Sequence, residues 1–107
     1  MAAAALAFRS FNFTNIPEGR WEQRNVILPQ ERRIVITVTG KTQFNNTDVD
    51  LFVHRGAGNN DNLVIQDVSI GPHSRVEFVV PANDTYRIRV GNHGPGRCNQ
   101  AVVTITE

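Results

Sequence analysis

The sequence contains little that would support disulfide bonding, thiolate metal sites or membrane insertion. Its single cysteine, Cys98, excludes an internal disulfide framework and every zinc site that needs two or more thiolates. No window approaches the ~18 consecutive apolar residues that a transmembrane helix needs. The opening residues Met1 to Ala7 lack the basic start and the length of a signal peptide. We therefore expect no membrane insertion and recognise no export signal.

The sequence also has almost no net charge. Eleven basic residues and ten acidic residues give a formal charge of +1, so we expect no long-range attraction to nucleic acid or to an anionic membrane. All of the basic residues except Lys41 are arginines. Arginine is enriched in protein interfaces because its planar guanidinium pairs with carboxylates and stacks on rings. The composition favours a chain with protein partners, as a homo-oligomer or within a larger assembly.

What the sequence does contain is a repeated alternation of apolar and polar residues, which is typical of β-strands with one buried face. In the segment 33–39, Ile34, Ile36 and Val38 share one side of the strand, and Gly40 ends the run. The inward faces predicted in the same way for later segments are Val76, Phe78 and Val80; Tyr86, Ile88 and Val90; and Ala101, Val103 and Ile105.

Clusters rich in Gly, Asn and Pro separate these segments and predict turns, which leaves almost no room for helices. We predict a single all-β domain, an antiparallel β-sandwich of seven or eight short strands. The predicted strands are residues 26–28, 33–39, 49–54, 63–70, 75–80, 85–90 and 101–106, with a further strand near 8–13.

The N-terminal segment differs from the rest because it concentrates aromatic residues. Phe8, Phe11 and Phe13 lie within six residues, and in an extended chain Phe11 and Phe13 share one face. Two interpretations are open: the segment closes the domain's own core as an edge strand, or it is an arm that packs on a neighbouring subunit. We therefore divide the chain into residues 1–13, an arm or edge strand, and residues 14–107, the sandwich.

Several segments resemble the bacterial pre-peptidase C-terminal domain. Residues 47–53, TDVDLFV, are similar to that family's DxDLYV strand, and residues 75–81, RVEFVVP, followed by 85–90, TYRIRV, are similar to its Tyr-bearing closing strands. The last strand of the family corresponds to residues 100–105, QAVVTI. The resemblance implies a jelly-roll-like β-sandwich without an active site. It further implies an accessory module of secreted enzymes that binds matrix protein or polysaccharide, in some members with calcium.

Oxygen donors gather at one predicted strand entrance. Asp48 and Asp50 follow Asn45 and Asn46, and alternation places the two carboxylates on the same face of the strand. Such donors suit a hard cation, so Asp48 and Asp50 are candidate ligands for Ca²⁺, which takes about six to eight oxygens. The alternative is that these acids hydrogen-bond to turn amides and bind no metal. We predict no other cofactor.

Four further residues are candidates for contact with a ligand or partner. Trp21 lies in a predicted loop, where it either caps the core or stacks on a sugar ring or a partner. Arg87 and Arg89 share one face of a strand, and Arg75 lies across from them if residues 75–80 and 85–90 pair as a hairpin. A basic stripe of this kind suits acidic glycans, phosphates or an acidic neighbour. A solvated face is the alternative for each arginine taken singly.

The sequence predicts no enzyme, because no serine lies in a nucleophile elbow and no group is placed to orient a pair formed by His93 and Cys98. We predict a structural assembly subunit, such as a virion (capsid) decoration protein or a filament subunit that uses its N-terminal arm for contacts. The alternative is an extracellular module that binds polysaccharide or matrix protein. A virion or an extracellular assembly is the favoured location.

Overall fold

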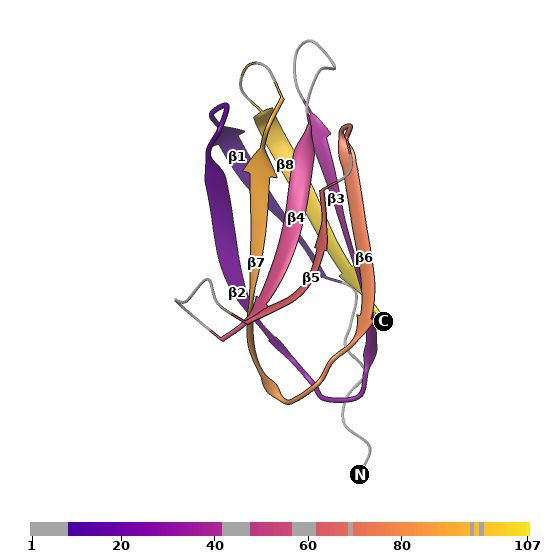
Figure 1. Ribbon diagram of the computed structural model, residues 1–107. Helices are drawn as coiled ribbons and strands as arrows, with labels where there is room; N and C mark the ends of the chain where they lie inside the picture. Colours follow the sequence, from indigo (N-terminus) through magenta and orange to yellow (C-terminus); the bar gives the residue numbers. More distant parts are fainter. Residues whose placement is uncertain (1–8, 42–47, 57–61, 69, 95, 97) are drawn as a thin grey trace.

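The computed structural model describes residues 9–41, 48–56, 62–68, 70–94, 96 and 98–107. These residues form eight β-strands in two antiparallel sheets that pack face to face (Figure 1). The described part of the chain contains no helix, and so none that could cross a membrane. The strands are β1 (Arg9–Ile16), β2 (Trp21–Leu28), β3 (Arg33–Lys41), β4 (Val49–Arg55), β5 (Leu63–Asp67), β6 (His73–Val79), β7 (Asp84–Asn92) and β8 (Cys98–Thr106).

The chain crosses between the two sheets at almost every connection. One sheet has the order β1-β8-β3-β6 and the other has the order β2-β7-β4-β5. Of the strands that follow one another in the sequence, only β4 and β5 pair with each other. The hairpin between residues 75–80 and 85–90, on which the place of Arg75 was conditional, does not form: β6 pairs with β3, and β7 pairs with β2 and β4. The predicted β-sandwich is confirmed.

The core lies between the sheets and is built from the alternating residues of both. In β3, Ile34 and Ile36 are fully buried, while Val35 and Thr37 on the other side are only half-buried. The inward faces predicted for the later strands are buried as well. β-branched and aromatic side chains suit this arrangement because they pack well against neighbours on a pleated surface. The remaining core residues include Val26, Leu28, Val49, Leu51, Val53 and Cys98.

The N-terminal strand is part of the domain. β1 pairs antiparallel with β8 at the edge of its sheet, and it continues across the expected boundary between residues 13 and 14. Phe13 is buried in the core and Phe11 packs against it, with an edge-to-face contact of 5.5 Å between the ring centroids. The guanidinium carbon of Arg24 lies 4.5 Å from the centroid of the Phe11 ring. Phe8 lies outside the described residues.

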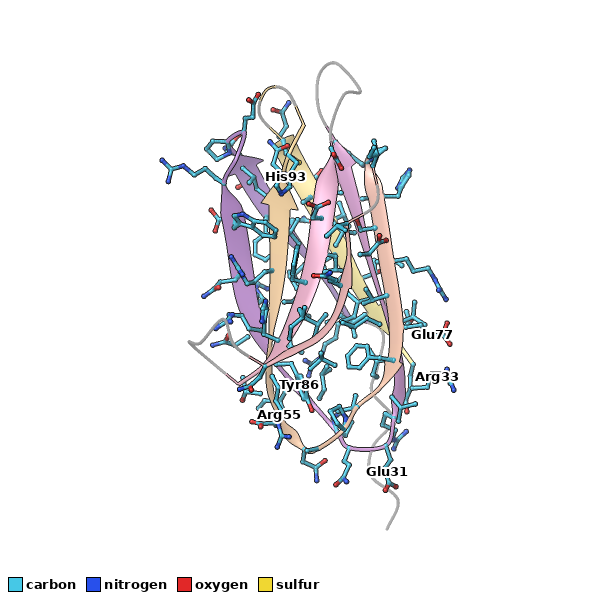
Figure 2. All side chains as sticks on the ribbon, in the orientation of Figure 1. Glu31, Arg33, Arg55, Glu77, Tyr86 and His93 are labelled. Carbon is cyan, nitrogen blue, oxygen red and sulfur yellow. The ribbon has the colours of Figure 1, made fainter. Side chains whose placement is uncertain are left out.

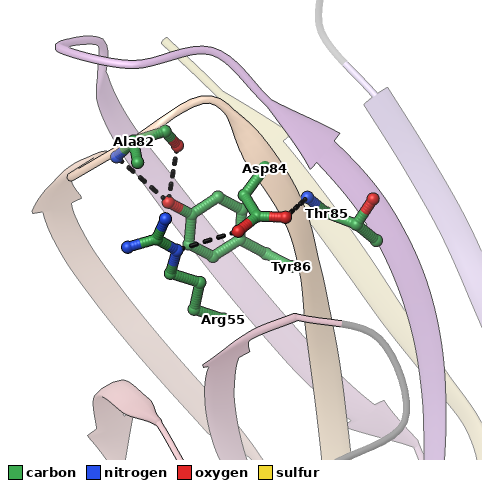
Figure 3. A network of polar contacts seen from close by, with 5 residues as sticks. All are labelled: Arg55, Ala82, Asp84, Thr85 and Tyr86. Atoms are coloured by element: carbon green, nitrogen blue, oxygen red, sulfur yellow. Dashed lines mark hydrogen bonds and ion pairs between the residues drawn. The ribbon is translucent and has the colours of Figure 1, made fainter.

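A polar network closes one end of the sandwich (Figure 3). The buried Tyr86 hydroxyl donates a hydrogen bond of 2.7 Å to the carbonyl of Ala82 and accepts one of 3.3 Å from the amide of the same residue. Beside it, Asp84 accepts hydrogen bonds from the Arg55 Nε at 2.8 Å and from the Thr85 amide at 2.7 Å. The network joins the start of β7 to the end of β4.

Candidate functional site

The outer face of the β2-β7-β4-β5 sheet carries polar and aromatic side chains in three rows. Because Leu51 and Ile88 point into the core, their neighbours in β4 and β7 point outward. Cross-strand pairing places Trp21, Gly91 and Asp50 in the first row; Gln23, Arg89, Phe52 and Gln66 in the second; and Asn25, Arg87 and His54 in the third. We call these ten residues the Trp21 face.

Trp21 lies on the edge strand of this face, and its ring extends over the neighbouring strand β7. The sequence predicts a loop at this position, but Trp21 is the first residue of β2. A Cβ atom at Gly91 would lie only 2.7 Å from the indole ring atoms, so the ring lies directly on the bare backbone of its cross-strand neighbour. Phe52 and His93 meet the indole edge-on, with centroid distances of 4.9 and 5.6 Å. These contacts hold a half-buried indole in one orientation at the surface.

The Arg89 guanidinium lies over the indole ring. Its carbon atom is 4.8 Å from the centroid of the Trp21 ring, a distance at which a cation is attracted to the ring. Burial lowers the pKa of Arg89 from its ordinary value, and the positive charge of Arg87 lowers it further. Arg87 is almost completely buried, with 1% of its surface exposed. The structure thus brings Trp21, Arg87 and Arg89 together, as three of the four predicted contact residues.

The fourth predicted contact residue, Arg75, lies on the other sheet. It is on the outer face of β6, where its guanidinium donates to Glu77 at 2.8 Å. Arg33, which Figure 2 labels beside Glu77, donates to the same carboxylate at 3.0 Å. The Arg75 backbone amide donates to the Asp67 carboxylate at 2.8 Å. Because β6 does not pair with β7, Arg75 cannot join Arg87 and Arg89 in one stripe. The hairpin assumption placed it wrongly.

Asp50 is tied to the loop that follows β7. Its carboxylate lies 3.0 Å from the Nε2 atom of His93, and the His93 backbone amide donates to the Asp48 carbonyl at 2.7 Å. Burial raises the pKa of Asp50, whereas His93 acts in the opposite direction. The Asp50 and His93 pair therefore fixes the imidazole beside Trp21.

The buried side chain of Asn92 binds the loop that follows β7. Asn92 is 1% exposed, and its side-chain amide donates to the carbonyls of Ile16 and Gly96, both at 2.9 Å. Its side-chain oxygen accepts a hydrogen bond of 3.1 Å from the Gly94 amide. One buried amide thus joins the end of β1 to the loop between β7 and β8, and it positions His93 next to it in the chain.

The two predicted calcium ligands, Asp48 and Asp50, contact different groups. Asp50 faces His93, whereas the Asp48 carboxylate accepts a hydrogen bond of 3.3 Å from the Gly71 amide, as expected of an acid that binds a turn amide. Asn45 and Asn46 lie outside the described residues. Within the described ranges, no group of three or more His, Cys, Asp or Glu side chains is arranged to hold a metal ion. Calcium binding stays a prediction.

Cys98 and His93, which lie close in sequence, have separate surroundings. Cys98 is the first residue of β8 and is fully buried in the core, where its thiol contacts the carbonyls of Gln100 at 3.4 Å and Lys41 at 3.9 Å. Burial raises the pKa of this thiol, which keeps it protonated and weakly nucleophilic. His93 is exposed and faces Asp50 instead.

A shallow cavity of about 380 Å³ lies at the other end of the same sheet. Arg55 and Asp84, which line it, already pair with each other at 2.8 Å. Both charges are therefore satisfied within the protein. The remaining lining residues are Gly56, Asn62, Leu63 and Val64.

Sequence reasoning missed several residues of the Trp21 face and its support. Phe52, Gln23 and Gln66 come from three different strands, and only the pairing of those strands reveals that they share a row with Arg89. A Trp aligned with a Gly across two strands is the one signal that could have been sought, but it required knowledge of the register. Asn92 lies in one of the Gly- and Asn-rich clusters that predict turns, so the sequence contains no signal that its side chain is buried.

Several solved structures share this fold. The pre-peptidase C-terminal domain of the collagenase from Bacillus anthracis matches with a TM-score of 0.70 and 12% identity, covering 92% of this chain and 88% of that chain. A surface-associated copper-binding protein of Methylomicrobium album matches with a TM-score of 0.64 and 11% identity, covering 91% and 92%. A periplasmic inhibitor of g-type lysozyme from Aeromonas hydrophila matches with a TM-score of 0.61 and 13% identity, covering 99% and 91%.

At these identities the similarity concerns the fold alone. It confirms the resemblance to the pre-peptidase C-terminal domain at the level of structure. No protein-family model and no curated protein matches the sequence. The comparisons define the chain as a small β-sandwich domain, of an architecture found in a C-terminal domain of a collagenase and in a lysozyme inhibitor.

Proposed function

We propose that this chain is a non-catalytic module that binds a polysaccharide on the Trp21 face. The observation that carries the proposal is the half-buried indole of Trp21, fixed on the backbone of Gly91 and next to Phe52. Sugar rings present apolar C–H faces that pack on aromatic rings, so an indole held in one orientation recognises them at low entropic cost.

Amide side chains on the Trp21 face support the same ligand. Gln23, Asn25 and Gln66 are exposed on this face, and an amide can both donate to and accept from sugar hydroxyls. The row from Gln23 to Gln66 crosses four strands, which is a span of about 14 Å at the usual spacing between strands. An extended chain of several sugar units fits such a row, and apolar contact with a few placed polar groups is typical of ligand sites.

The placement of the N-terminal strand favours this proposal over an assembly subunit. The assembly hypothesis relied on Phe8, Phe11 and Phe13 as contacts with a neighbour. Phe11 and Phe13 pack against the domain's own core, and Phe8 lies outside the described residues. The resemblance to the pre-peptidase C-terminal domain, which implies a binding module, agrees with this proposal, and the fold is shared.

Affinity gel electrophoresis with a panel of immobilised polysaccharides tests the proposal. We expect at least one polysaccharide to retard the wild-type protein, and Trp21→Ala to abolish that retardation. Ile27→Ala is the matched control because Ile27 points outward from the same strand, is 69% exposed and lies outside the Trp21 face. Its mobility should equal that of the wild type.

Two results would contradict the proposal. One is a wild-type protein that no polysaccharide in the panel retards. The other is a Trp21→Ala variant that is retarded as strongly as the wild type. Trp21→Phe, which keeps an aromatic ring, separates the loss of the ligand contact from a loss of folding, because it should retain part of the affinity.

A further inference from the structure

Among the arginines with described contacts, Arg89 and Arg24 contact an aromatic ring, and Arg24 lies beside Phe11, outside the Trp21 face. Arg33 and Arg75 pair with Glu77, and Arg55 pairs with Asp84, at N to O distances of 2.8 to 3.0 Å. By contrast, no carboxylate of the described residues lies within ion-pair distance of the Arg89 guanidinium. Its described contact is with the Trp21 ring.

The surroundings of Arg89 favour an incoming negative charge. The guanidinium is half-buried and lies near the positive charge of Arg87, and both effects penalise its own charge. A carboxylate placed beside it would offset both penalties. The acid on the same face, Asp50, already pairs with His93.

We infer that the polysaccharide on the Trp21 face is built from uronic acids, and that Arg89 pairs with a sugar carboxylate while the ring of that sugar or its neighbour packs on Trp21. This inference rests on the proposed function. The planar guanidinium fork matches a planar carboxylate through two parallel hydrogen bonds. Gln23 and Phe52 flank Arg89 in its row and contact the sugar on either side of the charged group.

A carboxylate fits this site better than a sulfate. Sulfated glycans carry a high density of negative charge, which clusters of exposed basic residues attract electrostatically. On the Trp21 face, Arg87 is almost completely buried and the exposed neighbours of Arg89 are amides. One accessible guanidinium among amides suits one carboxylate per sugar unit.

Polygalacturonate and its fully methyl-esterified form provide a matched pair of probes. Esterification removes the charge of each carboxylate and retains the sugar ring and its hydroxyls. We expect the wild-type protein to bind polygalacturonate about ten- to a hundredfold more tightly than the ester, as measured by quenching of Trp21, the chain's single tryptophan. Raising the ionic strength should weaken only the binding of the acid form.

Three arginine variants test whether the preference for the acid form depends on Arg89. Arg89→Gln should lower the affinity for polygalacturonate about ten- to a hundredfold and leave the affinity for the ester unchanged. Arg75→Gln is the control, because it removes the same charge from the opposite sheet and should change both affinities less than twofold. Arg89→Lys, which keeps the charge without the fork, should fall between the wild type and Arg89→Gln.

The results separate this inference from the proposed function. Equal affinity for the acid and the ester, lost in Trp21→Ala, would overturn the inference and leave the polysaccharide module standing. Preference for a sulfated glycan such as heparin over polygalacturonate would also overturn it. Absence of binding to any glycan would overturn the proposed function as well.

Discussion

Trp21 and Gly91 are direct cross-strand partners, and the indole occupies the space in which any residue other than glycine would place its Cβ at position 91. The indole can therefore pack directly on the backbone of β7, because Gly91 has no side chain. Phe52 and His93 then confine the ring from its edges. This pairing explains why a large aromatic ring lies in a defined orientation at the surface.

Replacing Gly91 with alanine is expected to displace the indole. The new Cβ would overlap the ring, so we expect a loss of about 1–3 kcal/mol in the free energy of unfolding and a shift in the emission maximum of Trp21. Urea denaturation and fluorescence measure the two effects. In a Trp21→Ala background the same Gly91→Ala change should cost almost nothing, and equal costs in both backgrounds would show that the ring and the new methyl group do not meet.

Replacing Asn92 with aspartate is expected to destabilise the loop between β7 and β8. The substitution keeps the size of the side chain but turns the group that donates to the Ile16 and Gly96 carbonyls into an acceptor. Because Asn92 is buried, we expect a loss of at least about 2 kcal/mol in the free energy of unfolding near neutral pH. Thermal and urea unfolding test this, and a neutral outcome would mean that the two carbonyls do not depend on Asn92.

Replacing Tyr86 with phenylalanine is expected to weaken the end of the sandwich without opening the core. The ring remains in place, but the hydroxyl that bonds to both backbone groups of Ala82 is lost. We expect a cost of about 1–2 kcal/mol in the free energy of unfolding, measured in urea. A protein as stable as the wild type would contradict this role. Tyr86→Leu should cost more, because it also removes packed volume from a fully buried site.

The ion pairs of Glu77 are expected to make stability depend on acid pH. Hydrogen bonds from Arg75 and, next in size, from Arg33 lower the pKa of Glu77 below its ordinary value of 4.5. The ionised group therefore stabilises the folded protein above that value, and this contribution is lost as the pH falls through the lowered pKa. Glu77→Gln should be less stable than the wild type at pH 7, and the difference should disappear in acid.

Glu31→Gln is the matched control for that experiment, because Glu31 is exposed and forms no ion pair with the described residues (Figure 2). Its stability at pH 7 should equal that of the wild type, because the substitution removes no ion pair within the described residues. A Glu77→Gln difference that persists unchanged below the lowered pKa would show that the ion pairs do not contribute. Because the group is at the surface, added salt should reduce the effect.

Much of the fold could be predicted because its signals are local. The alternation of Ile34, Ile36 and Val38 identified a strand and its buried face without reference to any other segment. Phe11 and Phe13 were placed on one face for the same reason. Arg75 was misplaced because its partner strand is decided by pairing across the sandwich, and the loop assigned to Trp21 was wrong because Pro17 and Gly19 before it suggested a longer turn.

The sequence by itself determined that this chain forms short strands with one apolar side, since a period of two residues leaves no other way to bury those side chains together. It also determined that Arg87 and Arg89 share a face. Only the tertiary structure decided that Trp21, Arg89 and Phe52 meet on one sheet while Arg75 lies on the other. Sheet membership depends on contacts between segments far apart in the chain, and no local pattern records which strands will pair.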